Sequence, residues 1–490
     1  MPEKYPPEGA ERAGVAAPDA ERIAEARRAF ETLRARRAER VAPSARERIE
    51  ALRRLRTSVT ARRGELAGAV HADFRKHPTE TELTEIQPVL AEVRHVIRHV
   101  RSWMRPRRVP SPLLLSGSRS EIRYEPRGVV LVLGPWNYPV NLMLSPLVAA
   151  VAAGNSVVLR PSEKAPHTAG VLERIVAESF PRDEVAVAGG GVEVAEALLR
   201  LPFDHFFFTG STEVGRKVMR AAADHLATVT LELGGKSPAL VDASADVAAS
   251  AERIAWGKFV NAGQTCVAPD YVLVDRARAG ELVEELMRAV GRLYGGTEEA
   301  RRRSGSFCRL VDDRAFERVA GMLEGSVAAG ARVEVGGTTD AAERYVAPTV
   351  LSGVTWEMTA MAEEIFGPVL PVIAYDSLDD ALRRIRERPA PLALYVFARD
   401  PGVVERVLGR TTAGGTVVND TLVHLANPGL PFGGVGESGQ GSYHGWFGFR
   451  AFSHERAVLV RGRFAPGRAL YPPYSERVSR LVEWLGRWMG

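Results

Sequence analysis

The chain has 490 residues, enough for two or three domains, each with a hydrophobic core of its own. Its 45% hydrophobic and 26% charged residues are typical of an ordinary globular protein and exclude a wholly disordered or fibrous chain. The 65 Lys and Arg against 60 Asp and Glu give a net charge of only +5, too small to predict a nucleic-acid partner, and two cysteines exclude a disulfide framework.

The N-terminal segment holds Pro2, Pro6, Pro7 and Pro18 and has no apolar run. It therefore does not resemble a signal peptide, and residues 1–19 are predicted to be a disordered tail. A cytoplasmic location is the expectation that follows.

Long amphipathic helices rich in Ala, Arg and Glu are predicted within residues 20–105, for example at 20–40 and 45–57. Six arginines and no acid lie between Arg94 and Arg108. Because no aromatic stacking platform accompanies them, a solvated helix face or a subunit contact is favoured over an RNA-binding patch. The prolines at 106, 110 and 112 are expected to end the helix.

Residues 128–159 contain no charged side chain, a feature that can indicate a membrane span. Prolines and turn residues such as Pro139, Pro146 and Gly154-Asn155 interrupt this segment. A lipid-facing helix would leave backbone groups unpaired there, so a buried strand, turn, helix and strand are predicted instead.

Short apolar runs alternate with helix-length segments from Gly128 to Leu233, which predicts a parallel sheet covered by helices on both faces. The predicted strands are 129–133, 156–159, 184–187, 203–208 and 227–231, and the predicted helices are 141–153, 167–180, 192–199 and 213–223. Ligands bind beyond the carboxyl ends of strands in such sheets, so 134–138, 160–163 and 209–215 are candidate binding segments.

The third of these segments reads Gly210-Ser211-Thr212-Glu213-Val214-Gly215 and follows a predicted strand. A glycine in such a turn lets a pyrophosphate approach the N–H groups at the positive end of a helix. A tight turn with a helix cap is the alternative, and it would be favoured if the segment stood alone. A second α/β stretch is predicted for 236–420, followed by a glycine-rich segment at 431–441.

Cys266 lies between Gly263 and Pro269, which break regular structure, and after a predicted helix at 248–260. Polar Gln264 and Thr265 precede it. Structural cysteines prefer apolar elements, whereas a nucleophilic thiol needs a partly exposed loop with hydrogen-bond donors near it. The spacing alone leaves both interpretations of Cys266 open.

Five motifs follow one another along the chain: Pro135-Trp136-Asn137-Tyr138-Pro139, Phe208 to Gly215, Leu231-Glu232-Leu233-Gly234-Gly235-Lys236-Ser237-Pro238, Gly263-Gln264-Thr265-Cys266, and Glu363-Glu364-Ile365-Phe366-Gly367-Pro368-Val369. In this order, and over residues 20–474, they resemble the aldehyde dehydrogenase superfamily. Further segments are similar to its class 3 branch of fatty and aromatic aldehyde dehydrogenases: Cys266 to Tyr271, Pro431 to Gly436, Tyr443-His444-Gly445, Phe452-Ser453-His454 and Tyr471-Pro472-Pro473.

The resemblance implies an α/β fold with three parts. A Rossmann-like NAD(P)-binding domain would take 20–112 and 125–235, and an α/β catalytic domain would take 236–440. A small β oligomerisation element at 113–124 and 441–462 would pair two copies into a homodimer. Residues 463–490 would form a C-terminal tail.

The resemblance also implies catalytic roles. Cys266 would attack the aldehyde carbon, Asn137 with the backbone N–H of Cys266 would hold the oxyanion, and Glu232 would activate the water that hydrolyses the thioester. Without the resemblance, Asn137 would be a turn residue and Glu232 would be the partner of Lys236 in a salt bridge. Glu232 favours release of a free acid over transfer to coenzyme A, because acylating relatives commonly lack this base.

NAD is the expected cofactor, with NADP as the alternative, and no metal site is expected. The resemblance assigns it seven residues: Arg160, Glu163, Gly210, Ser211, Gly215, Glu364 and Phe366. Arg160 stands where the family usually has lysine, and its guanidinium suits a 2′-phosphate that Glu163 would repel. Cys308 stands where class 3 relatives tend to have glycine and is interpreted as structural.

The expected substrates are medium- or long-chain aliphatic or aromatic aldehydes, in a pocket lined by Tyr138, Leu142 and residues 421–427, including His424. An acylating or reductive enzyme of the same fold and a non-catalytic binding protein are the alternatives.

The tail is expected to form an amphipathic helix whose apolar face is Val478, Leu481, Val482, Leu485, Trp488 and Met489. Residues 475–490 carry too many charges and are too short to span a bilayer. A peripheral membrane contact, a cover over the substrate entrance and a contact with the partner subunit remain open.

Overall fold

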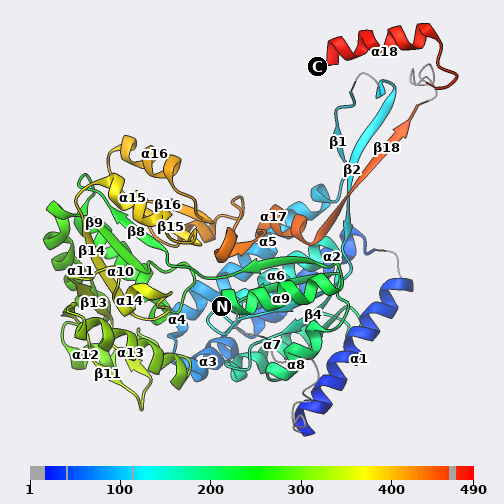
Figure 1. The fold of residues 1–490 in the computed structure, drawn as a ribbon. Coiled ribbons are helices and arrows are strands. Elements are labelled where there is room, and N and C mark those ends of the chain that lie inside the picture. Colours follow the sequence, from blue (N-terminus) through cyan, green and yellow to red (C-terminus); the bar gives the residue numbers. More distant parts are fainter. Residues whose placement is uncertain (1–16, 40–41, 113–114, 463–470, 490) are drawn as a thin grey trace, which may run out of the picture.

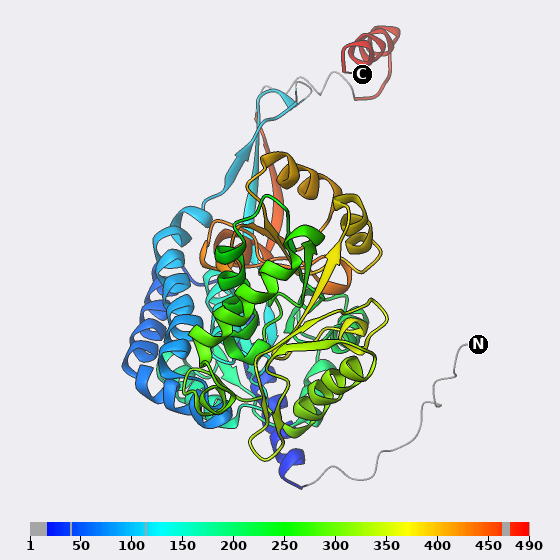
Figure 2. The ribbon, with the colours of Figure 1, turned by 90° about the vertical axis from the view of Figure 1, so that its left-hand side faces the viewer.

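The computed structural model describes residues 17–39, 42–112, 115–462 and 471–489. Two open sheets with their helices form the body, and a small third sheet extends from it (Figures 1 and 2). Most of the tail expected at 1–19 lies outside the described residues. Its predicted end at residue 19 is wrong, because helix α1 already begins at Ala17.

The N-terminal helices form where the sequence predicts them, although α1 begins three residues earlier and α2 ends four residues later than predicted. Helix α2 begins after Ser44, whose hydroxyl accepts a hydrogen bond from the N–H of Glu47 while the Glu47 carboxylate accepts one from the N–H of Ser44. Helix α5 buries valines spaced three or four residues apart and exposes Arg94, Arg98 and Arg101, so the arginine-rich segment includes a solvated helix face. The elements are α1 (Ala17–Glu39), α2 (Ala45–Ala61), α3 (Arg63–Phe74), α4 (Pro78–Thr81), a π-helical turn (Glu82–Ile86) and α5 (Gln87–Trp103).

The first sheet has the order β17-β7-β6-β3-β4-β5, and all its strands except β17 run parallel. Alternate residues of β3 belong to two separate cores, one on each face, so helices cover both faces as predicted. Its strands are β3 (Val129–Leu133), β4 (Ser156–Arg160), β5 (Val185–Val187), β6 (His205–Thr209), β7 (Thr228–Glu232) and β17 (Gly439–Gln440); its helices are α6 (Asn141–Ala153), α7 (Pro166–Ser179), α8 (Val192–Leu199) and α9 (Thr212–Asp224).

The charge-free segment 128–159 forms β3, α6 and β4, as predicted. Nearly every residue of α6 is buried, including Pro146 inside it, because the helix packs between the sheet and α5. Among the described residues, no helix combines the length and the apolarity that crossing a membrane requires.

The second sheet has the order β10-β13-β14-β9-β8-β15-β16 and is parallel except for β10. Its strands are β8 (Pro238–Val241), β9 (Tyr271–Asp275), β10 (Arg332–Val335), β13 (Thr349–Ser352), β14 (Val369–Tyr375), β15 (Ala393–Phe397) and β16 (Gly415–Val418). The helices around it are α10 (Val247–Phe259), α11 (Ala279–Tyr294), α12 (Glu298–Arg303), α13 (Asp313–Ala328), α14 (Thr359–Ala362), α15 (Leu378–Arg386) and α16 (Pro401–Arg410). A two-stranded ribbon of β11 (Thr339–Asp340) and β12 (Tyr345–Val346) lies apart from this sheet.

The third sheet is a three-stranded antiparallel arm that points away from the body (Figure 1). It pairs β1 (Arg107–Val109) and β18 (Ser453–Arg461) with β2 (Ser118–Pro126), so the two segments expected to share a β element are hydrogen-bonded to each other. Helix α17 (Gly445–Ala451) lies at the base of the arm, and α18 (Glu476–Met489) lies beyond its far end (Figures 1 and 2). The side chains of Leu485, Trp488 and Met489 are outside the described part of the predicted apolar face.

The topology brings the motifs to one place. The carboxyl ends of β3, β4, β6 and β7 share one edge of the first sheet, because Leu133 pairs with both Arg160 and Phe208, and Thr209 pairs with Glu232. In the second sheet, the Cys266 turn precedes β9 and the Glu364 loop precedes β14, and these strands are parallel neighbours.

Candidate active site

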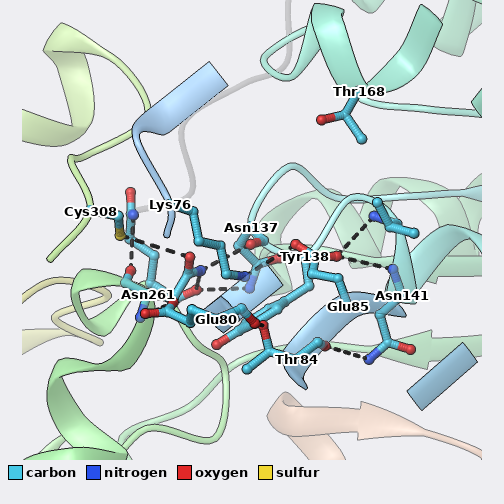
Figure 3. Close-up of polar contacts among 12 residues, drawn as sticks. Lys76, Glu80, Thr84, Glu85, Asn137, Tyr138, Asn141, Thr168, Asn261 and Cys308 are labelled. Atoms are coloured by element: carbon cyan, nitrogen blue, oxygen red, sulfur yellow. Dashed lines mark hydrogen bonds and ion pairs between the residues drawn. The ribbon is translucent and has the colours of Figure 1, made fainter. Parts of the chain in front are cut away.

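Asn137 and the turn that carries Cys266 lie against each other. Asn137 is 3% exposed in the loop after β3. Its Nδ2 donates to the carbonyl of Gln264 at 3.0 Å, and Asn261 Nδ2 donates to the carbonyl of Asn137 at 2.9 Å (Figure 3). Because Gln264 precedes Cys266 by two residues, these bonds place the Asn137 amide beside the cysteine turn.

Gln264, for which no role was expected, holds this turn in place. Its side chain is fully buried, and its Nε2 donates to the carbonyls of Asn261 and Arg309 at 3.0 and 3.1 Å. Its Oε1 accepts the N–H of Val311 at 3.0 Å. The sequence signal for this role of Gln264 was its position inside the Gly263-to-Cys266 motif. There it is a buried amide whose hydrogen bonds are satisfied.

Tyr138 makes a second link between the same two segments. Its hydroxyl lies 2.6 Å from Oγ1 of Thr265, the residue before Cys266. The ammonium of Lys76 lies 4.1 Å from the centre of the Tyr138 ring (Figure 3). The predicted substrate residue Tyr138 therefore packs against the cysteine turn and has a cation on its ring.

Cys266 lies in a turn after the short 3₁₀ helix Val260–Gly263 and is partly exposed. Burial of the thiol, with the negative charges of Glu364 and Glu232, raises its pKa to about 12, and the N–H groups of Cys266 and Val267 oppose this effect. In this state the side chain is a neutral thiol at neutral pH. Attack on a carbonyl requires that a base removes its proton or that a positive charge approaches it.

Glu232, the last residue of β7, is 2% exposed. Within the described residues, neither of its carboxylate oxygens has a hydrogen-bond partner. Burial raises the pKa of this carboxyl well above its ordinary value. A buried and unpaired carboxyl next to a cysteine is the environment expected of a general base that works near neutral pH.

The alternative interpretation of Glu232, a salt bridge with Lys236, is wrong. Lys236 Nζ instead lies 2.5 Å from Oδ2 of Asp270 and donates to the carbonyls of Ala360 and Glu363 at 2.7 and 2.9 Å. Asp270 Oδ1 accepts the N–H of Ile365 at 3.1 Å. Lys236 and Asp270 therefore anchor the loop that carries Glu364 and Phe366, a function that sequence spacing did not reveal.

Glu364 lies against Gly234. A Cβ at Gly234 would stand 2.0 Å from Glu364 Oε2, so only glycine leaves room for the carboxylate in this position. Burial and the negative charge of Asp270 raise the pKa of Glu364 to about 8. Phe366, in the same loop, has a positive φ of 45° and packs edge-on against Trp136 with ring centres 5.5 Å apart. The structure thus brings Phe366 to the segment that contains Asn137 and places Glu364 against Gly234.

Arg160 ends β4, and its side chain is 9% exposed. Its Nη2 donates to Glu163 at 2.7 Å and to the carbonyls of Gly190 and Gly191 at 3.1 and 2.9 Å. The Glu163 side chain is 37% exposed. Arg160 therefore neutralises the carboxylate of Glu163, one of the expected cofactor residues, and three acceptors hold its guanidinium in place.

The turn after β6 caps a helix, as one of the two interpretations of the segment predicts. Ser211 is the N-cap of α9, and its hydroxyl accepts the N–H of Val214 at 3.4 Å. At Gly215 a Cβ would stand 2.7 Å from the Leu233 side chain, so glycine permits close packing of helix on strand. Gly210 packs in the same way against the ring of Phe208. The N-terminus of α9 points at the edge that carries Arg160 and Glu232.

His424 lies in the 3₁₀ helix Val423–Ala426, and its ring packs against Phe432 with centres 6.2 Å apart. Among the described residues its two ring nitrogens are buried without a partner, and burial lowers the pKa to about 4. Phe432 also stacks on His444. Burial raises the pKa of the Tyr443 phenol, and the negative charges of Glu232 and Cys266 raise it further. These rings come from the C-terminal part of the chain and border the site, and of them only His424 was predicted to do so. Leu142, also predicted for the pocket, is 8% exposed and lies in the first turn of α6.

Comparisons with known proteins agree with this geometry. The aldehyde dehydrogenase family model matches residues 3–458. The chain belongs to the aldehyde dehydrogenase family. It is 42% identical to the dimeric NADP-preferring aldehyde dehydrogenase of Canis lupus familiaris, over 88% of this chain and 94% of that protein, which agrees with the class 3 branch predicted from the motifs.

Solved structures of aldehyde dehydrogenases share the fold. The substrate-bound AldH of Staphylococcus aureus superimposes with a TM-score of 0.90 at 38% identity, over 94% of this chain and 99% of that one. The NAD⁺ complex of an aldehyde dehydrogenase from Mycobacterium tuberculosis superimposes with a TM-score of 0.82 at 29% identity, over 90% and 91%. As an aldehyde dehydrogenase, the chain is an oxidoreductase that converts aldehydes to carboxylic acids, and the predicted α/β fold is confirmed.

Proposed function

We propose that this aldehyde dehydrogenase oxidises medium- or long-chain aliphatic or aromatic aldehydes through a thioester on Cys266 that Glu232 helps to hydrolyse. The observation that carries the proposal is the Glu232 carboxyl, which is buried, lacks a partner among the described residues and acts electrostatically on the Cys266 thiol. An unpaired buried carboxyl destabilises the fold, so its presence beside a cysteine favours a chemical role.

In the proposed reaction the Cys266 thiolate adds to the aldehyde carbon and forms a C–S bond. The resulting oxyanion is held by the N–H of Cys266 and by the Asn137 amide, which has two N–H donors and uses one for Gln264. Bound NAD(P) supplies the acceptor for the hydride that leaves the carbon, and a thioester remains on Cys266. Glu232 takes a proton from water, whose oxygen attacks the thioester carbon, breaks the C–S bond and releases the acid.

Three features favour NAD(P) binding by the proposed residues. The N-terminus of α9 after Gly210 and Ser211 offers N–H groups for a pyrophosphate, with Gly215 packed below. Glu364, which lies against Gly234, would bind the nicotinamide ribose, and Phe366 would pack beside the nicotinamide ring. Glu163 would bind the adenosine ribose; with Arg160 neutralising it, NADP stays an alternative to NAD.

We place the aldehyde chain between Tyr138 and Leu142 on one side and the His424, Phe432 and His444 rings on the other. Aromatic and aliphatic walls with few polar groups suit an apolar substrate. Release of a free acid is favoured over acyl transfer because Glu232 is present, and the acylating alternative predicts that turnover requires coenzyme A.

The free edge of the arm, on β18, exposes Leu459 and Val460, and we propose that two copies pair through it into a homodimer, as the dimeric relatives suggest. For α18 we propose a peripheral membrane contact of a protein located in the cytoplasm. The helix exposes Leu481 and Val482, and Arg477 and Arg480 can approach anionic lipid.

The test is NAD(P)H formation at 340 nm with a panel from acetaldehyde through decanal to benzaldehyde and cinnamaldehyde. Without coenzyme A we expect steady turnover, none for Cys266→Ser, and no more than a single burst for Glu232→Gln, because the thioester then persists. Folded protein that reduces neither NAD nor NADP with any aldehyde would reject the proposal and favour a binding protein.

A further inference from the structure

Three charged side chains that the proposed reaction does not use lie near Asn137 and Tyr138 (Figure 3), one of them half-buried and two buried. Lys76 follows α3, Glu80 is in α4, and Glu85 is in the π-helical turn. Lys76 and Glu85 are both 0% exposed, and their Nζ and Oε1 atoms are 3.2 Å apart. Charges at such positions destabilise a fold unless they make specific contacts.

On one side, these charges hold the segment that carries Asn137. Glu85 Oε2 accepts the N–H groups of Val140 and Asn141 at 3.0 and 3.1 Å, at the start of α6. Lys76 lies on the ring of Tyr138. Lys76 and Glu85 thus hold the segment from Tyr138 to Asn141, which directly follows Asn137.

On the other side, Glu80 holds the turn that leads to Cys266. Its Oε1 accepts the N–H of Asn261 at 3.0 Å. Asn261, Ala262 and Gly263 have consecutive positive φ angles of 54°, 51° and 74°. This conformation is unfavourable for an alanine, so contacts from outside must hold the turn. Asn261 in turn donates to the carbonyls of Asn137 and Gln264.

We propose that Glu80 is a positioning residue of this enzyme. It fixes the left-handed turn at Asn261 and so keeps the Cys266 nucleophile in register with the Asn137 amide. Glu80 contacts neither reacting group; it acts through Asn261, and the inference rests on the proposed function of Cys266 and Asn137.

The test compares three substitutions at Glu80 in the full-length protein. Glu80→Ala removes the acceptor and leaves the Asn261 N–H unpaired, so we expect kcat to fall about 100-fold, the effect of a displacement of roughly 1 Å. Glu80→Gln keeps a carbonyl oxygen for this N–H and should restore most of kcat. The matched control is Glu82→Ala, because Glu82 lies in the next turn but pairs with Arg63 and Gln87.

Four quantities separate positioning from a general loss of structure: kcat, KM, the NAD dissociation constant from fluorescence quenching, and the alkylation rate of Cys266 by iodoacetamide. The proposal predicts that kcat and the alkylation rate change while KM and NAD affinity stay near wild type. Lys76 is unsuited to the test, because its loss leaves two carboxylates without a countercharge.

Three results would overturn the proposal. They are full kcat in Glu80→Ala, an equal loss of kcat in Glu82→Ala, and a loss of kcat in Glu80→Ala that only follows the folded fraction. If Glu80→Ala does not fold, Glu80→Asp, which withdraws the carboxylate by one methylene, should lose about tenfold in kcat, and wild-type kcat in that variant would also overturn it. A wild-type protein without turnover would instead reject the proposed function.

Discussion

Cys266, Glu232 and Glu364 form a cluster of ionisable groups whose charged forms are all disfavoured. Burial comes first among the causes at each of them, and the acids act on the thiol in addition. The Cys266 thiolate and the Glu232 and Glu364 carboxylates thus cannot all be charged in the unliganded site. A cofactor with a positive nicotinamide ring would relieve this repulsion, so binding and activation of Cys266 are expected to be coupled.

This coupling predicts a steep pH dependence for Cys266 reactivity. The thiol pKa is raised to about 12, so the thiolate fraction in the free enzyme should keep rising with pH through the accessible range. We expect the iodoacetamide alkylation rate to increase about tenfold per pH unit from 7 to 10 without a plateau. The rate is measured by mass spectrometry of the Cys266 peptide.

Cys308 is the internal control for this experiment, because it is buried and its pKa is raised well above the ordinary value. It should remain unmodified in the folded protein. Addition of NAD should raise the Cys266 rate at pH 7. A plateau near pH 8.5 in the free enzyme would mean that the thiol is an ordinary one.

At the level of elements, the arm and α18 serve separate proposed contacts. The arm is held together by the nine-residue pairing of β18 with β2, and α17 at its base packs against α5 and α6 of the body. Helix α18 follows a segment outside the described residues and lies beyond the arm (Figure 1). A contact between two arms and a contact of α18 with lipid can therefore be removed independently.

Removal of residues 475–490 should abolish membrane binding and leave the homodimer intact. Liposomes of phosphatidylcholine with phosphatidylserine are sedimented with full-length and shortened protein, and light scattering after gel filtration gives the mass. Full-length protein that stays in the supernatant would reject the membrane contact. Conversion of the shortened protein to monomer would show that α18 packs on the partner subunit instead.

At the scale of the whole molecule, local patterns predicted the elements well. Strand β3, helix α6 and helix α8 have the predicted bounds, because apolar runs of fixed length separate the turn residues there. The motifs predicted roles for Asn137, Glu232 and Cys266, and the structure places the Asn137 loop against the turn that carries Cys266. The sequence could not reveal that Lys236 pairs with Asp270, or that Glu80 reaches Asn261 across 181 positions, because such contacts depend on β8 and β9 being neighbours and on where α4 packs.

His205 shows how a single buried group affects the stability of the whole fold. It is 1% exposed between β6 and β7, its Nδ1 lies 2.7 Å from Oγ1 of Thr228, and its ring packs on Phe452 at the base of the arm. Burial lowers its pKa from 6.5 to about 3. The unfolded chain therefore binds a proton at His205 between pH 6.5 and pH 3 that the folded protein does not, and stability falls as the pH falls.

From pH 7 to pH 5, His205 should lower the free energy of unfolding by about 2 kcal/mol, since each pH unit below 6.5 is worth about 1.4 kcal/mol. His205→Gln keeps a hydrogen-bonding side chain for Thr228. In this variant the decrease in the free energy of unfolding should be smaller by that amount. Urea unfolding followed by circular dichroism at both pH values measures it, with the exposed His454→Gln as the control. An equal decrease in wild type and His205→Gln would mean that the folded protein accommodates the imidazolium, and that the packing of β6 and β7 against Phe452 loosens at pH 5 without unfolding.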